Sequence, residues 1–217
     1  MKKIKLGLGG ALMLSAMLIS DKTSVFSVYI FASILHEFGH LIAARALKIK
    51  IKEIKLGFSG VRIIVDEEIT AYSDEILLSL AGPAVNLVCM IFCFAFCGYM
   101  RIGKEELFKS AEFFFYNGKF DLKGVIGFFA VSSFVQAFTN LLPIKSFDGG
   151  RAVECLMSWL IGVGFAERIL TLTTLFSAFI LWTVGLYLML KISSGLGIYI
   201  FALCVFALCL EKTNFNK

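Results

Sequence analysis

Long apolar runs separated by short polar segments dominate the chain. A membrane-spanning helix needs about 20 mostly apolar residues, and six runs reach or approach this length. The first and last of them are shorter than the other four. The pattern therefore predicts an all-α membrane protein with six spans, at residues 6–20, 25–47, 76–100, 124–142, 169–190 and 196–210.

Two shorter stretches show other periods. Apolar and polar residues alternate through much of residues 49–65, on both sides of a Gly-Phe-Ser-Gly sequence, which predicts a small β-hairpin after the second span. Such a hairpin either pairs with an extended peptide at its edge or lies on the membrane surface without a ligand. Between residues 101 and 121, apolar residues recur at helical spacing opposite charged ones. This stretch predicts an amphipathic helix on the outer membrane surface.

Composition and charge add a topology. The 217 residues are 59% hydrophobic and 17% charged, which is too apolar for an ordinary soluble domain. With six spans and a cytoplasmic N-terminus, fourteen of the 21 Lys and Arg residues lie on the cytoplasmic side, as the positive-inside rule requires. The net charge of +5 then reflects topology and needs no nucleic acid. A signal peptide is the alternative for the first run, but no small-residue cleavage site precedes Asp21, so we expect a retained span.

The second span contains the sequence His-Glu-Phe-Gly-His, which includes both histidines of the protein, His36 and His40. Residues four apart lie on the same face of a helix, so the two imidazoles can converge on one metal ion. Glu37 lies beside them, where a general base acting on water is needed. Ionisable groups inside a membrane are costly and usually functional. The pattern favours a metalloenzyme over two histidines that serve only the core.

A third metal ligand has to come from another residue type. Catalytic zinc sites typically have three protein ligands and one open position. Asp148 is the best candidate because it follows the helix-breaking Pro143, precedes a flexible Gly-Gly pair and lies on the same predicted side as His40. Glu154, one turn beyond, is the serious rival. The other competitors are the cysteines and Glu53, Glu67 and Glu68.

Further polar groups and cysteines occur inside the predicted spans. Pro83 near the start of the third span predicts a kink that faces protein, and Asn86 follows one turn later. Asn86 either faces the interior of the bundle or only bonds a neighbouring helix. Cys89, Cys93 and Cys97 recur at helical spacing. They read better as a packing stripe than as a metal-binding face, and no disulfide framework is indicated.

Three motifs occur in a fixed order: His-Glu-Phe-Gly-His from His36, Gly-Pro-Ala-Val-Asn from Gly82, and Asn-x-x-Pro-x-x-x-x-Asp-Gly from Asn140. With these motifs the chain resembles the site-2 protease family of intramembrane zinc metalloproteases, over about residues 24–151. The resemblance implies one Zn²⁺ bound by His36, His40 and Asp148.

The same resemblance assigns roles to three further residues. It implies that Glu37 is the catalytic acid and base, and that Asn86 and Asn140 lie near the site and orient the substrate. We therefore predict a zinc endopeptidase that cuts a membrane-associated protein near the cytoplasmic surface. Two alternatives stay open: a non-proteolytic binding partner on the same scaffold, and a membrane lipid hydrolase.

The order of spans points to one branch of that family. We expect one membrane-embedded domain, with a first span and loop at residues 1–24, a catalytic core at 25–151, two C-terminal spans at 152–217, and no PDZ or CBS domain. This arrangement looks most like the stage IV sporulation protein FB branch. Two features depart from it, since many members end in a CBS domain and often have Pro-Leu where this chain has Ser146-Phe147. The branch suggests a bacterial cell membrane, a sporulation sigma-factor precursor as substrate and membrane-protein regulators.

Overall fold

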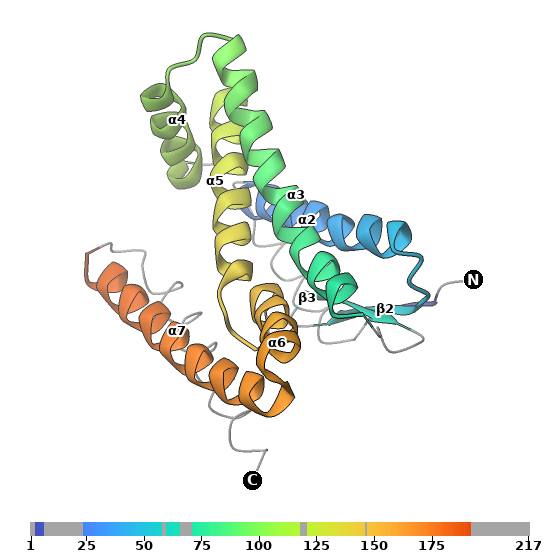
Figure 1. Ribbon diagram of the computed structural model, residues 1–217. Coiled ribbons are helices and arrows are strands. Elements are labelled where there is room, and N and C mark those ends of the chain that lie inside the picture. The colour runs from blue at the N-terminus through green and yellow to red at the C-terminus, as the bar shows by residue number, and fades with distance from the viewer. Residues whose placement is uncertain are drawn as a thin grey trace. The chain divides into compact units, whose positions relative to one another are not determined.

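The computed structural model describes residues 3–6, 24–57, 60–65, 71–117, 121–145 and 147–191 (Figure 1). The predicted first span lies outside these described residues, except for Leu6. The predicted last span also lies outside them. By its internal contacts the chain divides into two compact units. The first unit is Met1–Thr70 with Ala81–Phe138, and the second is Ala71–Leu80 with Thr139–Lys217.

Four helices among the described residues are long and apolar enough to cross a membrane. Large apolar side chains point outward from them, for example Phe92, which is 70% exposed, and Leu172, which is 68% exposed. Such apolar surfaces suit a lipid environment. A helix also satisfies its own backbone hydrogen bonds, as a membrane-spanning segment must. The four helices are α2 (Val25–Ala46), α3 (Tyr72–Tyr99), α5 (Leu122–Leu141) and α7 (Val163–Lys191). They match the four longer predicted spans and indicate a multi-pass membrane protein.

In the first unit, α4 (Lys104–Asn117) lies alongside α5 (Figure 1). It is amphipathic, as predicted, and buries Leu107, Ala111 and Phe114. Glycines bring the two helices close together, since a Cβ atom on Gly124 or Gly127 would lie 2.8 Å from a carbonyl oxygen of α4. An ion pair between Lys123 and Glu106, with 2.5 Å between nitrogen and oxygen, joins the same two helices.

The first unit also contains a three-stranded sheet in the order β1-β2-β3. Strands β2 (Ile51–Gly57) and β3 (Gly60–Val65) pair antiparallel, with Ile54 opposite Ile63 and an irregularity between Ile51 and Glu53. Strand β1 (Lys3–Leu6) pairs parallel with β2. This third strand was not predicted, because four residues carry too short a pattern to identify a strand whose partner lies some fifty residues away.

The second unit contains α6 (Asp148–Ile161), a helix that was not predicted. The interpretation of Gly149 and Gly150 as a flexible pair is wrong, because both lie in its first turn. A Cβ atom on Gly149 would overlap the backbone of Leu141, and one on Gly150 would overlap the carbonyl of Ile144. These glycines therefore permit tight packing. Nearby, α7 contributes to a small core of Ile144 and Ala178, joined by Leu142, Phe147 and Leu181.

Candidate metal centre

Helix α2 places His36 and His40 on one face, and both are buried, with 5% and 8% of their surface exposed. Their Nε2 atoms lie 3.3 Å apart, and the ring planes are nearly perpendicular at 81°. Two nitrogens bound to one tetrahedral zinc at about 2.0–2.1 Å would lie about 3.3–3.4 Å apart. The two imidazoles therefore already have the separation that a shared zinc ion requires.

Two glycines bring α3 against this face of α2. A Cβ atom on Gly39 would lie 2.5 Å from the Ala81 carbonyl oxygen and 2.9 Å from Val85 Cγ2. A Cβ atom on Gly82 would lie 2.7 Å from His36 Nε2 and would overlap His40 Nε2. Gly82 is thus a backing surface for both rings, where any side chain would compete with the ligand atoms for space. The glycine inside the histidine motif serves the same close packing.

A buried polar group lies behind His36. Asn86 on α3 is fully buried, and its Nδ2 is 3.4 Å from His36 Nδ1 and 3.2 Å from Gln136 Oε1. Gln136 on α5 is 4% exposed, and its Nε2 donates to the Tyr29 carbonyl at 3.1 Å and to Ser33 Oγ at 3.0 Å. A chain of amides therefore connects three helices to the back of His36.

Sequence reasoning identified Asn86 but missed Gln136. Asn86 is buried in the interior, as predicted, and its amide lies within hydrogen-bond distance of both His36 and Gln136. The available signal for Gln136 was an uncharged amide in the middle of a predicted span, since such a group seeks a partner on another helix.

The two remaining polar residues of the predicted site are less enclosed. Glu37 follows His36 on α2 and is half-buried. Asn140, in the last turn of α5, is half-buried and belongs to the second unit.

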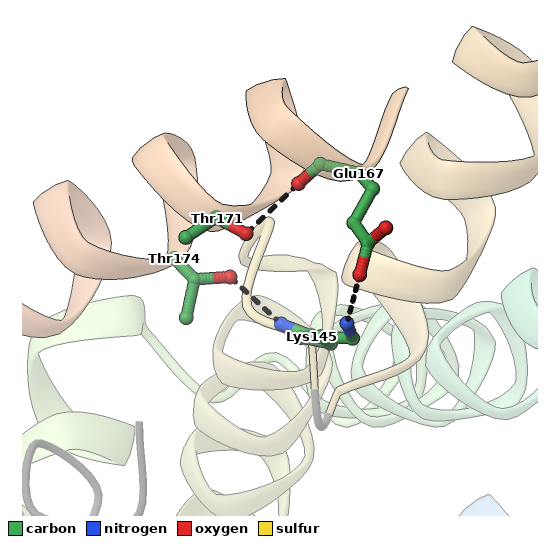
Figure 2. Close-up of polar contacts among 4 residues, drawn as sticks. All are labelled: Lys145, Glu167, Thr171 and Thr174. Atoms are coloured by element: carbon green, nitrogen blue, oxygen red, sulfur yellow. Dashed lines mark hydrogen bonds and ion pairs between the residues drawn. The ribbon is translucent and has the colours of Figure 1, made fainter. Parts of the chain in front are cut away.

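Asp148 also belongs to the second unit, as the half-buried first residue of α6. The segment just before it is tied to α7 (Figure 2). The backbone N–H of Lys145 donates to Thr174 Oγ1 at 3.0 Å, and its Nζ lies 3.4 Å from Glu167 Oε1. Thr171 Oγ1 in turn donates to the Glu167 carbonyl at 2.8 Å. Lys145, three residues before Asp148, is therefore held against α7 by one backbone-to-side-chain hydrogen bond and one ion pair.

The rival ligands have other surroundings. Glu154 lies half-buried in the second turn of α6. Burial, with a smaller contribution from the nearby carboxylate of Glu75, raises the pKa of the Cys155 thiol to about 12. Without metal, Cys155 is therefore a protonated thiol at neutral pH. Cys93 and Cys97 are buried and free, as expected of a packing stripe.

Comparisons with known proteins identify a family, a curated relative and a solved structure with a similar fold. The model of peptidase family M50 matches residues 25–184. A candidate zinc metalloprotease of Synechocystis sp. is 25% identical over 134 residues, which are 61% of this chain and 31% of that protein. The chain thus spans about a third of the length of that relative. Among solved structures, the site-2 protease from Methanocaldococcus jannaschii superimposes with a TM-score of 0.57 at 20% identity, covering 96% of this chain and 89% of that one. This likeness indicates a shared fold.

Proposed function

The chain belongs to peptidase family M50, and from this premise we propose that it is an intramembrane zinc metalloprotease. The observation that carries the proposal is the 3.3 Å separation of His36 Nε2 and His40 Nε2 within a helix apolar enough to cross a membrane. Glu37 lies next to His36 on that helix. Two buried imidazoles at this spacing suit a shared zinc ion, and ionisable groups inside a membrane are usually functional.

We propose that the ligand set is completed by Asp148, so that His36, His40 and Asp148 each offer one ligand atom. Neutral imidazole nitrogens and a carboxylate oxygen are all zinc ligands of catalytic sites, which keep one position open. The contacts of Lys145 with Thr174 and Glu167 on α7 support a fixed position for the segment that leads to Asp148. Glu154, one turn later in the same helix, is the competing ligand that the experiments must separate.

Bound zinc would supply a Lewis acid and make water more acidic. In our proposal the Glu37 carboxylate takes a proton from the attacking water and later gives it to the amide nitrogen of the leaving segment. The new C–O bond forms first and turns the carbonyl oxygen into an oxyanion. The C–N bond then breaks as the protonated amine leaves, so one water is consumed for each peptide bond. The Asn140 amide donates to the developing oxyanion, an effect typically worth about 3 kcal/mol. Asn86 and Asn140 orient the substrate.

The proposed substrate is a membrane-associated protein cut near the cytoplasmic surface. A substrate helix has to unwind before its backbone can react, and in a membrane the exposed N–H and C=O groups need new partners. Among the described strands, β1 covers one side of β2, and β3 forms the opposite edge of the sheet. An extended substrate segment that pairs with β3 would supply those partners.

The motif resemblance alone supports most of the finer assignments. A sporulation sigma-factor precursor as substrate, membrane-protein regulators and a bacterial cell membrane are proposals on that basis. A cytoplasmic N-terminus is a proposal that the distribution of Lys and Arg residues supports. Identifying the cut by mass spectrometry in a single-span test protein distinguishes proteolysis from lipid hydrolysis or simple binding. A cut close to the membrane surface is the expected result.

Replacing Glu37 tests the chemistry directly. We expect Glu37→Gln to keep its zinc, because the glutamate is not a proposed ligand, and to lose cleavage by about a thousandfold, the usual scale of general acid–base catalysis. Glu105→Gln on the surface helix α4 is the matched control and should cleave like wild type. Undiminished cleavage by Glu37→Gln would exclude the proposed mechanism.

A further inference from the structure

The Tyr29 carbonyl fixes the direction of the hydrogen bonds behind His36. A carbonyl oxygen can only accept, so the Gln136 atom that lies 3.1 Å from it must be Nε2. The Ser33 hydroxyl agrees, since it donates to the same carbonyl at 3.2 Å and accepts from Gln136 Nε2 at 3.0 Å. Gln136 is therefore held with its acceptor, Oε1, facing Asn86.

Asn86 passes this direction on to the histidines. Only its Nδ2 can serve Gln136 Oε1, at 3.2 Å, and the second hydrogen of Nδ2 faces His36 Nδ1 at 3.4 Å. When Nδ1 is the acceptor, the proton of a neutral His36 lies on Nε2. That proton points to His40 Nε2, which is 3.3 Å away and accepts it.

A metal requires the opposite arrangement at His36. A histidine that binds metal through Nε2 carries its proton on Nδ1, and that N–H needs an acceptor. Asn86 Oδ1 is buried and has no hydrogen-bond partner among the described residues. A half-turn of the Asn86 amide would bring Oδ1 to His36 Nδ1. The same half-turn places Oδ1 against Gln136 Oε1, so two acceptors would meet.

We propose that Gln136 is a positioning residue that tunes metal affinity through Asn86. Gln136 holds neutral His36 in the tautomer that carries its proton on Nε2, where the proton blocks metal binding. When metal binds, the Asn86 amide has to turn, and this turn breaks its hydrogen bond to Gln136 Oε1. The inference rests on the proposed zinc site and extends it to Gln136 on α5, which is not one of the proposed ligands. A polar residue on a neighbouring helix thereby sets how readily the site fills.

Gln136→Leu is the first variant to measure. It removes the acceptor that stabilises the Asn86 amide in its metal-free orientation. The hydrogen bonds of Gln136 to Tyr29 and Ser33 are lost both with and without metal, so their loss does not change the zinc affinity. Zinc affinity, measured by competition with a chelator, should rise about fivefold, the equivalent of one net hydrogen bond. The matched control is Ser133→Ala, because Ser133 is buried on the same helix and its Oγ has no hydrogen-bond partner among the described residues. Its affinity should equal that of wild type.

Nuclear magnetic resonance reads the proton position directly. The protein has two histidines, so labelling histidine with ¹⁵N gives four ring signals, which a His40→Asn variant assigns. Metal-free wild type should carry the His36 proton on Nε2, and zinc should move it to Nδ1. In metal-free Gln136→Leu the proton should already shift toward Nδ1.

The outcomes separate this inference from the proposed function. A metal-free wild type with the His36 proton on Nδ1 would overturn the inference, whatever the protein cleaves. Equal zinc affinities of wild type and Gln136→Leu would overturn it as well. If neither wild type nor Ser133→Ala binds zinc, the proposed function fails. The position of the His36 proton in the metal-free protein then still tests the direction of the hydrogen bonds from Gln136 through Asn86 to His36. Should Gln136→Leu not fold, Asn86→Asp replaces it, because a carboxylate cannot donate to Nδ1 and should give the Nδ1–H form without metal.

Discussion

The histidine region and the aspartate region are both built around glycines, but those glycines face different atoms. A Cβ atom added at Gly82 on α3 would meet the ring nitrogens of His36 and His40, which are the ends of side chains that can rotate. A Cβ atom added at Gly149 on α6 would meet the backbone of Leu141, which cannot move independently of its helix. The same substitution should therefore damage metal binding in the first region and folding in the second.

Gly149→Ala should have the largest effect on stability. Its Cβ atom would overlap the Leu141 backbone, and overpacking of this kind costs up to about 3 kcal/mol. We expect a clear drop in the thermal unfolding midpoint in detergent. Gly164→Ala on α7 is the control, because no atom of the described residues lies within 4 Å of its added Cβ and alanine favours helix. An unfolding midpoint of Gly149→Ala equal to that of the control would refute the backbone packing.

Gly82→Ala should act on the metal instead. The added methyl would displace the imidazoles, so zinc affinity should fall by about a hundredfold, as for other changes that misplace ligands. The unfolding midpoint of the metal-free protein should change little, since the rings can rotate. Gly98→Ala on the same helix is the control. Its added Cβ has no neighbour within 4 Å in the part of the chain that the structure describes, so the variant should bind zinc like wild type. Wild-type zinc affinity in Gly82→Ala would show that the glycine does not back the ligands.

Thr174→Val should give the smallest effect of the three. It removes the acceptor for the Lys145 backbone N–H and should cost about 1 kcal/mol. Thr173→Val is the control, because the Thr173 hydroxyl donates only to the Leu170 carbonyl of its own helix. The difference between the two variants in unfolding midpoint measures the tie that precedes Asp148. No difference would mean that this tie does not stabilise the second unit.

The helices that face lipid were the most predictable part of the fold. Continuous apolar runs identified α2, α3, α5 and α7 to within a few residues, because a helix in a membrane satisfies its own backbone whatever its neighbours are. Helix α6 was missed since its two leading glycines read as a break. Their helical conformation depends on close contacts with Leu141 and Ile144, which no local pattern reveals.

The candidate site divides in the same way. The spacing of His36 and His40 lies within one helix, so the sequence alone predicted that their rings converge. Gln136 reaches His36 through Asn86, across three helices. Long-range contacts of that kind leave no periodic signal along the chain. The role of Gly82 against the rings was missed for the same reason.

Zinc content tests the central claim most directly: His36, His40 and Asp148 bind one metal ion. We would measure zinc in detergent-purified wild type, Asp148→Ala and Glu154→Ala after equilibration with the same buffered zinc. The proposed ligand set predicts about one zinc per chain in wild type and in Glu154→Ala, and little in Asp148→Ala. A full complement of zinc in Asp148→Ala, or its loss in Glu154→Ala, would contradict that ligand set.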